Sequence, residues 1–522
     1  MKKIYGLMMT VCLISATSCK KYLDVNTNPN SPQDVTANLL LSPMLHWMAT
    51  SPVYDARFIS RYTQNFTSTA AGSTWDLQGY DPAGDIAGQL WRDVYFSFGQ
   101  NLVNMTNKAE AEQRWDLLGV AYILKAWGWL QLTDVHGEVI VKEAFDQSRT
   151  KFDYDSQQIA YDEVKRLLGL AITNLQRTDG AVDATFLGKT DLVYKGDRTK
   201  WLKFAYGLMG LTLNHYSNKD NYNPDEVIAN IDKSFVGNVD DAGVKYTGLS
   251  NDDRNFIGAT RNNFNSFRQT AFILNLMNGG ATGGVSDPRL SRMLSSSPDG
   301  TPRGVVTGAG TASFTAAQTP FNIWGYATLP IVGTPTKYVF DDKSKFPIMT
   351  YAELQFIKAE AAFRKGDKAM ALDAYSKAIA AHIDFVNTSN ADIGGTPTQI
   401  SPTDKDTFVK SPLVVPTAAA NLTLTQIMTQ KYVALWGWGF VETWMDMRRY
   451  HYTDVDPATN NQVYVGYVFP TTLYADNNAK PAYRIRPKYA SEYVNNVEAL
   501  NAIGALARDY HTKEMWITQK GN

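Results

Sequence analysis

The chain has 522 residues, in which 50 Lys and Arg balance 51 Asp and Glu, and it contains only two Cys. A nearly neutral charge disfavours a nucleic-acid-binding protein, which would carry a basic excess. Two cysteines cannot stabilise a chain of this length through disulfides, so we expect a large hydrophobic core.

The N-terminus has the three parts of a secretory signal. A basic start at residues 1–3 precedes an apolar run at 4–14, and small residues then lead to Cys19. The apolar run is shorter than the roughly 20 residues that a membrane-spanning helix needs. We therefore predict that residues 1–18 are a signal peptide.

Cys19 is predicted to carry a lipid. A cysteine directly after small residues resembles the bacterial lipobox, although Ala16 stands where lipoboxes usually have Leu. Because Cys12 lies inside the signal, Cys19 is the only cysteine of the mature chain, and acylation accounts for a lone exported thiol. The alternative is an ordinary signal peptide followed by a chance cysteine. Since residues 20–38 are rich in Asn, Pro and Asp, we expect residues 19–38 to form a lipidated tether.

Helical periodicity then dominates the chain up to about residue 235. Apolar side chains recur at helical spacing in five stretches, at about 41–48, 90–102, 120–130, 164–175 and 201–212. A loop of small and polar residues, from about 65 to 84, separates the first two stretches. The pattern favours a mostly α fold.

The helical period is lost from about 236 to 345. This stretch is dense in Gly, Thr, Ser, Asn and Pro, and it predicts long loops with a few short elements. Its Gly279–Gly284 segment lacks the Lys-Ser/Thr pair that follows a phosphate-binding loop, so we interpret it as a turn region. Loops of this length in a compact protein are usually functional.

A helix pair is predicted at about 350–385. Gly366, Ala371, Tyr375 and Ala378 have the spacing of a tetratricopeptide unit, in which small residues allow two helices to pack closely. A generic helical hairpin is the alternative. After a second loop at 386–420, residues 422–450 predict a last long helical stretch, and the tail from 453 is expected to be mostly irregular. We expect residues 39–522 to form a single domain.

No motif for catalysis or metal binding emerges. No two of the six histidines lie three or four residues apart, so a zinc site is not expected. The sequence has no nucleophile-elbow or phosphate-loop motif and no complete set of penicillin-binding motifs. A carboxylate pair for glycoside hydrolysis would leave no sequence signature, because its spacing is spatial. We predict no enzyme activity and no cofactor, and a surface hydrolase remains the alternative.

Aromatic residues in the loops are the candidate ligand contacts. The candidates come from two loop segments, and they are Trp75, Tyr80, Phe321, Trp324 and Tyr326. A ring on such a loop has little neighbouring core to cover it, and an exposed aromatic surface often marks a binding site. The alternative is that these rings fasten the loops onto the helices.

Six segments in order resemble the SusD/RagB family of outer-membrane nutrient-binding lipoproteins of Bacteroidetes. They are Cys19–Pro29, Gly119–Gly137, Gly196–Phe204, Glu360–Ala378, Glu442–Arg449 and Arg484–Asn496. Ala490 replaces a usual Pro, and Gly207–Gly210 departs from the family's usual Asn-Ser-Leu. These departures indicate a divergent, SusD-like subgroup.

The resemblance implies a fold of about eight helices in four tetratricopeptide-like pairs, with a loop-rich region that carries the ligand site. It also implies a SusC-like, TonB-dependent outer-membrane transporter as partner, with this protein as its lid. The implied activity is non-catalytic capture of glycans, or of peptides in some members. The expected location is the outer membrane, facing the exterior and anchored through Cys19.

Overall fold

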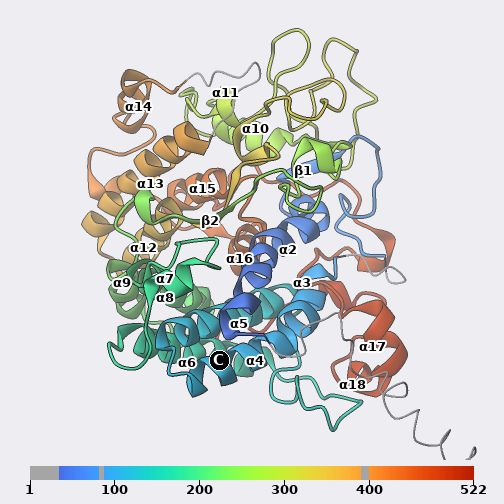
Figure 1. The fold of residues 1–522 in the computed structure, drawn as a ribbon. Helices are drawn as coiled ribbons and strands as arrows, with labels where there is room; N and C mark the ends of the chain where they lie inside the picture. Colours follow the sequence, from blue (N-terminus) through green and yellow to red (C-terminus); the bar gives the residue numbers. More distant parts are fainter. Residues whose placement is uncertain (1–34, 82–86, 390–398) are drawn as a thin grey trace, which may run out of the picture.

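The computed structural model describes residues 35–81, 87–389 and 399–522, so the predicted signal peptide and Cys19 lie outside the described residues. The architecture is mostly helical, as predicted, and the loops of the 236–345 stretch gather at one end of the helices (Figure 1). The helices of the first half are α2 (Leu41–Tyr62), α3 (Gln89–Arg92), the π-helix η2 (Asp93–Phe98), α4 (Gly99–Ala111), α5 (Trp115–His136), α6 (Gln157–Gln176), α7 (Ala184–Gly188), α8 (Arg198–Asn214), η3 (His215–Asn218) and α9 (Pro224–Asp232). The later helices are α10 (Ala271–Met277), α11 (Leu290–Met293), α12 (Tyr351–Lys365), α13 (Lys368–Ser389), α14 (Pro402–Val409), α15 (Leu424–Leu435), α16 (Phe440–Arg449), α17 (Tyr489–Asn495) and α18 (Val497–Ala502).

Helix α5 lies at the centre of the first half. It is apolar on nearly all sides and buried along most of its length, as expected for a helix surrounded by others. It pairs with α6 and also contacts α4 and α8. Gly119 makes the approach to α6 possible, because a Cβ atom there would lie 2.6 Å from Cγ of Leu175.

The predicted tetratricopeptide-like pair is present as α12 and α13, which pack against each other. Thr350 and Glu353 form a capping box that starts α12, and Gly366 ends it with a φ of +90°. The side chains of Ala371 and Ala378 are fully buried, as the motif requires. The structure thus has a packed helix pair where one was expected, and its assignment as a tetratricopeptide-like unit stays a prediction.

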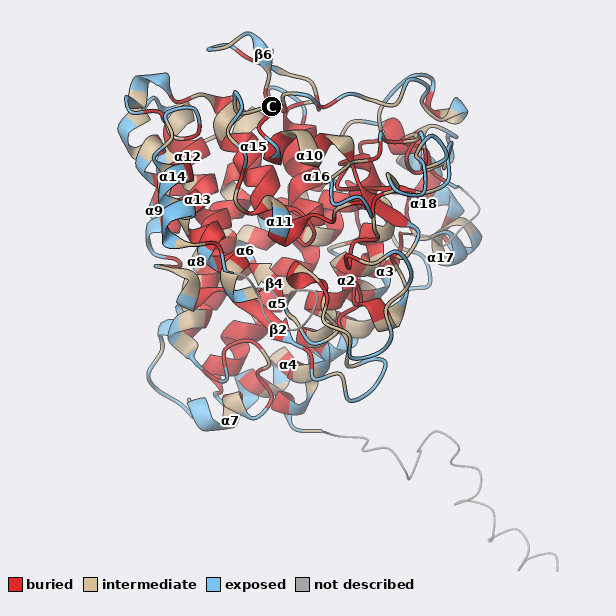
Figure 2. Cartoon of the chain, turned by 90° about the horizontal axis from the view of Figure 1, so that it is seen from above, coloured by how far each residue is buried: buried red, intermediate tan, exposed pale blue. Residues whose placement is uncertain are grey.

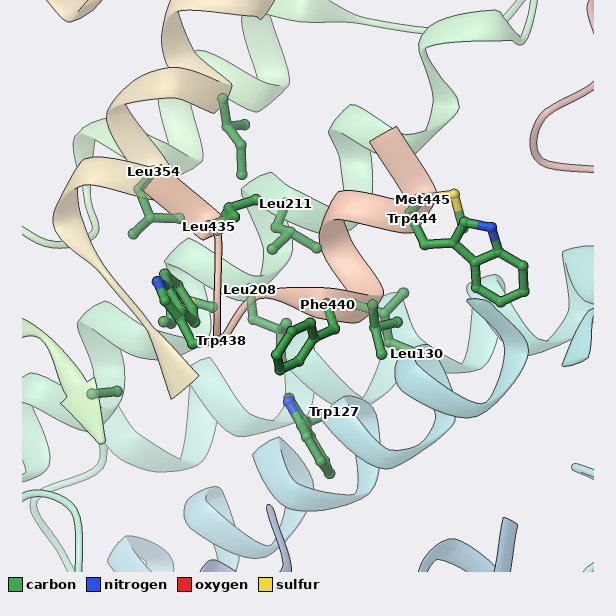
Figure 3. Packing of buried hydrophobic residues seen from close by; sticks show 14 of the residues in the cluster. Trp127, Leu130, Leu208, Leu211, Leu354, Leu435, Trp438, Phe440, Trp444 and Met445 are labelled. Atoms are coloured by element: carbon green, nitrogen blue, oxygen red, sulfur yellow. The ribbon is translucent and has the colours of Figure 1, made fainter. Parts of the chain in front are cut away.

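The predicted stretch at 422–450 is two helices. Gly437 has a φ of +84°, which a helix does not accommodate, so α15 ends and α16 begins after a sharp turn. Trp438 and Phe440 from this turn lie beside Leu208 of α8 and Trp127 of α5 in the hydrophobic core (Figure 3). Helix α16 also packs against α2. The turn therefore helps to bring α2 and α16, from the first and last parts of the described chain, into one hydrophobic core. Figure 2 shows this core as the buried centre of the molecule.

The strands that the structure describes form short antiparallel pairs. They are β1 (Phe66–Ser68) with β3 (Phe267–Gln269), β2 (Ala242–Lys245) with β4 (Lys345–Met349), and β5 (Val455–Asp456) with β6 (Asn461–Gln462). In the first pair, Phe66 lies opposite Gln269. This pairing fastens the loop after α2 to the loop-rich stretch, and it positions the site described below.

A buried ionic cluster joins the helix pair to the C-terminal helices. Arg449 of α16 donates from Nη1 and Nη2 to the two carboxylate oxygens of Glu360 of α12, at 2.7 and 2.9 Å. Its Nη2 also donates to Asp446 at 2.6 Å. The side chains of Arg449 and Glu360 are fully buried. Although burial alone would raise the pKa of Glu360, Arg449 holds that pKa well below its usual range.

The cluster continues to α15 and to the end of α8. Lys431 Nζ lies 2.7 Å from Glu442 and 2.8 Å from Asp446, and all three side chains are buried. The other carboxylate oxygen of Glu442 lies 2.9 Å from Nε2 of His215. Asn214 donates to Glu360 at 2.8 Å. Helices α8, α12, α15 and α16 are thus held by one set of charged hydrogen bonds.

None of the helices within the described ranges is both long and apolar enough to cross a bilayer.

Arg449→Met tests the ionic cluster. The substitution leaves the buried carboxylates of Glu360 and Asp446 without this cation, so we expect the free energy of unfolding to fall by about 3–5 kcal/mol in urea. The control is Lys377→Ala, which removes an exposed pair with Asp373 on α13 and is expected to cost about 0.5 kcal/mol or less. Equal losses for the two variants would contradict the role of the cluster.

Glu353→Gln tests a buried carboxyl beside the cluster. Burial, with the negative charge of Glu442, raises the pKa of Glu353 to about 8 from 4.5. The unfolded chain therefore releases this proton at lower pH, and stability falls by up to about 1.4 kcal/mol per pH unit as pH rises from about 4.5 to 8. Glutamine does not titrate but can still accept the Thr350 backbone N–H of the capping box.

We expect the unfolding free energy of Glu353→Gln, relative to the unsubstituted protein, to be higher at pH 8 than at pH 5. Urea unfolding at both pH values measures this. Glu112→Gln, at an exposed position after α4, is the matched control. A difference between Glu353→Gln and the unsubstituted protein that does not change with pH would contradict the assignment.

Candidate functional site

A cavity of about 670 Å³ lies at the loop-rich end of the molecule. Four segments form its walls: the loop after α2 from Gln64 to Leu77, helix α10, the turn at 306–309 and the loop at 466–472. These segments are far apart in the sequence. Their meeting makes this cavity a candidate site, with a volume in the range of small-ligand pockets.

Backbone hydrogen bonds hold the walls of the cavity together. The N–H of Gly72 donates to the carbonyl of Gly308 at 2.9 Å, next to the pairing of β1 with β3. Gly308 has a φ of +81°, and a Cβ atom there would lie 3.1 Å from Cδ2 of Leu77. On the opposite wall, Nε2 of Gln64 donates to the carbonyl of Val468 at 2.7 Å. The cavity is therefore shaped mainly by fixed backbone.

Two polar side chains in the cavity have unused hydrogen-bonding capacity. The hydroxyl of Thr307 is buried and has no hydrogen-bond partner among the described residues. The side-chain amide of Asn275 on α10 makes no hydrogen bond to another described residue. A buried polar group without a partner costs free energy, and a bound ligand with hydroxyl groups would remove that cost.

The rest of the wall is largely apolar. Leu77, Phe272 and Pro470 line it, and the half-buried ring of Phe469 is held by edge contacts with Tyr452 and Tyr467, at 5.3 Å between ring centroids. A fixed, partly exposed ring next to free amide and hydroxyl groups suits a ligand that has both apolar faces and hydroxyls.

No Asp, Glu, His, Lys or Arg lines the described walls of this cavity. General acid–base catalysis needs a titratable group within hydrogen-bond reach of the reacting bond. Likewise, across the residues that the structure describes, no three His, Cys, Asp or Glu side chains are grouped to hold a metal ion. The geometry of the cavity suits binding.

Trp75 and Tyr80 are not exposed, so the expectation that these rings are free at the surface is wrong. Their exposed fractions are 6% and 4%. Trp75 packs on Phe58 and Tyr62 of α2, and Tyr80 packs on Trp75. The loop folds back onto α2, and the buried pair of Arg61 with Asp76, at 2.6 Å, reinforces this contact. These rings fasten the loop that forms one wall of the cavity.

For the second aromatic segment, residues 321–326, the expectation of exposed rings is also partly wrong. Trp324 is fully buried, and its indole N–H donates to the carbonyl of Ile257 at 2.8 Å. Phe321 and Tyr326 are half-buried, and the Tyr326 hydroxyl donates to the carbonyl of Pro335 at 2.8 Å. None of the five predicted aromatic residues lines the cavity.

The sequence analysis missed Asn275, Thr307 and Phe469. A single Asn, Thr or Phe carries no signal by itself. The nearest sequence signal is the glycine in three of the wall segments, since Gly72, Gly308 and Gly466 all have positive φ values. Such glycines mark turns in which backbones approach closely.

Solved structures share the fold of this chain. A SusD/RagB family protein from Bacteroides thetaiotaomicron has a TM-score of 0.71 and 20% identity, over 94% of this chain and 100% of that one. A SusD homologue from Bacteroides fragilis has a TM-score of 0.70 and 17% identity, over 93% and 100%. A chitin-binding SusD homologue from Flavobacterium johnsoniae has a TM-score of 0.65 and 19% identity, over 92% and 98%.

A comparison with curated proteins finds no match. The sequence model of the SusD-like family, described as "starch-binding associating with outer membrane", matches residues 29–471. This match covers most of the 522 residues, and it includes every segment that forms the cavity except Thr472 at its edge. The chain belongs to the SusD-like family.

Proposed function

We propose that this protein captures glycans at the bacterial surface without catalysis and delivers them to a SusC-like, TonB-dependent transporter. The observation that carries the proposal is the cavity, which offers free hydroxyl and amide groups beside a fixed ring and has no titratable lining. The family's description as starch-binding supports a sugar ligand, as does the chitin-binding homologue with the same fold.

The cavity favours a glycan over a peptide. A peptide captured by its ends would need charged partners for its amine and carboxylate, and the lining has none. Sugar hydroxyls suit the free Asn275 amide and Thr307 hydroxyl, and a sugar face suits the Phe469 ring. A peptide-binding member of the same importer class remains the second candidate, because the family resemblance includes such proteins.

A hydrolase acting on the same glycans is the third candidate. Glycoside hydrolysis generally uses two carboxyl groups flanking the scissile bond, and the lining of the cavity contains no carboxyl group. Release of reducing sugar by the purified protein, lost on substitution of a single carboxylate, would overturn the non-catalytic proposal.

The aromatic residues predicted from the sequence take two roles in this proposal. Trp75, Tyr80 and Trp324 are positioning residues that hold the loops, because they are buried against neighbouring segments. Phe321 and Tyr326 are proposed outer contacts for a long glycan, since both rings are half-buried.

Thr307→Val tests the cavity. Valine keeps the shape of threonine but removes a hydroxyl that has no partner in the protein, so we expect unchanged or higher thermal stability. Among the glycans tested, we expect the affinity for any that the protein binds to fall by about tenfold, which corresponds to one lost hydrogen bond. Calorimetry and affinity electrophoresis with chitohexaose, maltohexaose and a tripeptide panel measure the effect.

The matched control for this test is Thr336→Val. Thr336 also has a buried hydroxyl without a partner, but it does not line the cavity. Asn275→Ala and Phe469→Ala are expected to lower the affinity for the same glycan. Asn104→Ala, on an exposed face of α4, is expected to leave it unchanged. Unchanged glycan affinity in all three cavity variants would refute the site, and binding of tripeptides alone would favour the second candidate.

Cys19→Ala tests the proposed lipid anchor. We expect the variant protein to leave the membrane pellet for the soluble fraction and to lose incorporation of labelled palmitate, because acyl chains supply the membrane affinity. Cys12→Ala, within the predicted signal peptide, is the control and is expected to stay in the pellet. Retention of Cys19→Ala in the membrane fraction would contradict the anchor.

A further inference from the structure

A second cavity lies away from the proposed glycan site, where α17 meets α3 and η2. Its volume is about 450 Å³. Figure 1 shows α17 beside α3, on the side of the molecule away from α12 and α13, and Figure 2 agrees. No residue lines both cavities.

Aromatic and aliphatic side chains form most of the wall of this second cavity. Four of the lining residues are aromatic: Trp91, Tyr95, Phe96 and Phe152. Ile140 and Ala144 complete the apolar part. Phe96 is unusual, because the residue is 73% exposed although it lines a concave apolar surface. A ring in this position can be covered by a ligand that enters the cavity.

The local backbone of η2 is what places Phe96 there. Residues 93–98 form a π-helix, a conformation that is rare and is frequently found at functional sites. The carboxylate of Asp93 anchors its first turn by accepting hydrogen bonds from Ser51, Gln89 and Ser97. After Phe98 the chain returns to a regular α-helix in α4, which begins at Gly99.

The other walls are fixed as well. The Tyr95 hydroxyl donates to the carbonyl of Ile140 at 2.9 Å and accepts from the N–H of the same residue at 2.8 Å. Trp91 is held between Tyr95 and His136, with ring centroids 4.8 and 5.1 Å away. A cavity with walls held in this way is preorganised, which lowers the entropic cost of binding.

Charged side chains line the remaining part, and two of the three are cationic. They are Arg92, Lys488 and Glu492. The Glu492 carboxylate is already occupied, because it accepts hydrogen bonds from Tyr154 at 2.8 Å, Asn496 at 3.1 Å and Ser491 at 3.2 Å. The exposed Arg92 guanidinium makes no hydrogen bond or ion pair with another described residue. The charge in the lining that has no partner among the described residues is therefore the positive charge of Arg92.

We propose that this second cavity binds a small aromatic or aliphatic anion, with its apolar body between Trp91 and Phe96 and its acidic group at Arg92. The apolar wall supplies the contact area, and the unpaired guanidinium supplies a charge-assisted hydrogen bond. A neutral molecule of the same shape lacks the second contact and binds less tightly. The site is independent of the glycan cavity.

The test uses the purified mature protein and the fluorescent aromatic sulfonate 8-anilinonaphthalene-1-sulfonate. We expect saturable binding, displaced by 3-phenylpropionate at lower concentration than by the neutral 3-phenylpropanol. Phe96→Ala is expected to lower the affinity for the sulfonate and for both competitors by about tenfold, because the ring covers the apolar body of the ligand. Arg92→Gln is expected to lower the affinity for the two anions by about fivefold and to remove the preference for the acid over the alcohol.

Matched controls separate this site from general surface binding. Leu249→Ala removes an apolar side chain that is 89% exposed elsewhere, and Arg508→Gln removes an exposed cation. Neither is expected to change the affinity for the sulfonate, and Phe469→Ala in the glycan cavity is also expected to leave it unchanged. Equal displacement by the acid and the alcohol, or an affinity unchanged in both Phe96→Ala and Arg92→Gln, would overturn the proposal.

Discussion

The buried pairing of Arg449 with Glu360 is the interaction on which the arrangement of the helices depends. Two charges shielded from solvent are costly unless further hydrogen bonds accompany the pair, and here Asn214, Tyr450 and Arg364 add hydrogen bonds to Glu360. These partners come from α8, α12 and the end of α16. A small shift of any of these helices would leave a charge unpaired, so the cluster selects one packing of the tetratricopeptide-like pair against the C-terminal helices.

In the proposed glycan cavity, different loop residues have different roles. Large rings such as Trp75 and Trp324 are buried and hold the loops in place. Small and polar residues such as Thr307 and Gly308 then face the space between the loops. A loop covered by its own aromatic side chains can present unpaired hydroxyl and amide groups without losing its shape. The cavity therefore presents polar groups to a ligand, although the loops that form it are rich in aromatic residues.

Local sequence patterns were sufficient for the helices and for the α12–α13 pair, because helical periodicity and the Gly366 turn act over neighbouring residues. They were insufficient where distant segments meet. Trp75 looked exposed because the residues that bury it, on α2, are not its neighbours in the loop. The partners of Arg449 were equally hidden, since Glu360 lies 89 positions away. Thr307 could not be singled out, because a missing partner is visible only in three dimensions.

The contacts of α2, and of the loop that follows it, with α15 and α16 have a consequence for how the chain acquires its fold. The Tyr432 hydroxyl donates to the carbonyl of Thr63, and the Trp436 indole donates to the carbonyl of Asn65, across separations of 369 and 371 residues. Helix α2 is made early, and the part of it that packs on α16 stays uncovered until nearly the whole chain has been synthesised. Contacts of such long range slow folding and prolong the exposure of apolar surface. A newly made chain would therefore depend on protection from aggregation for most of the time before its two ends meet.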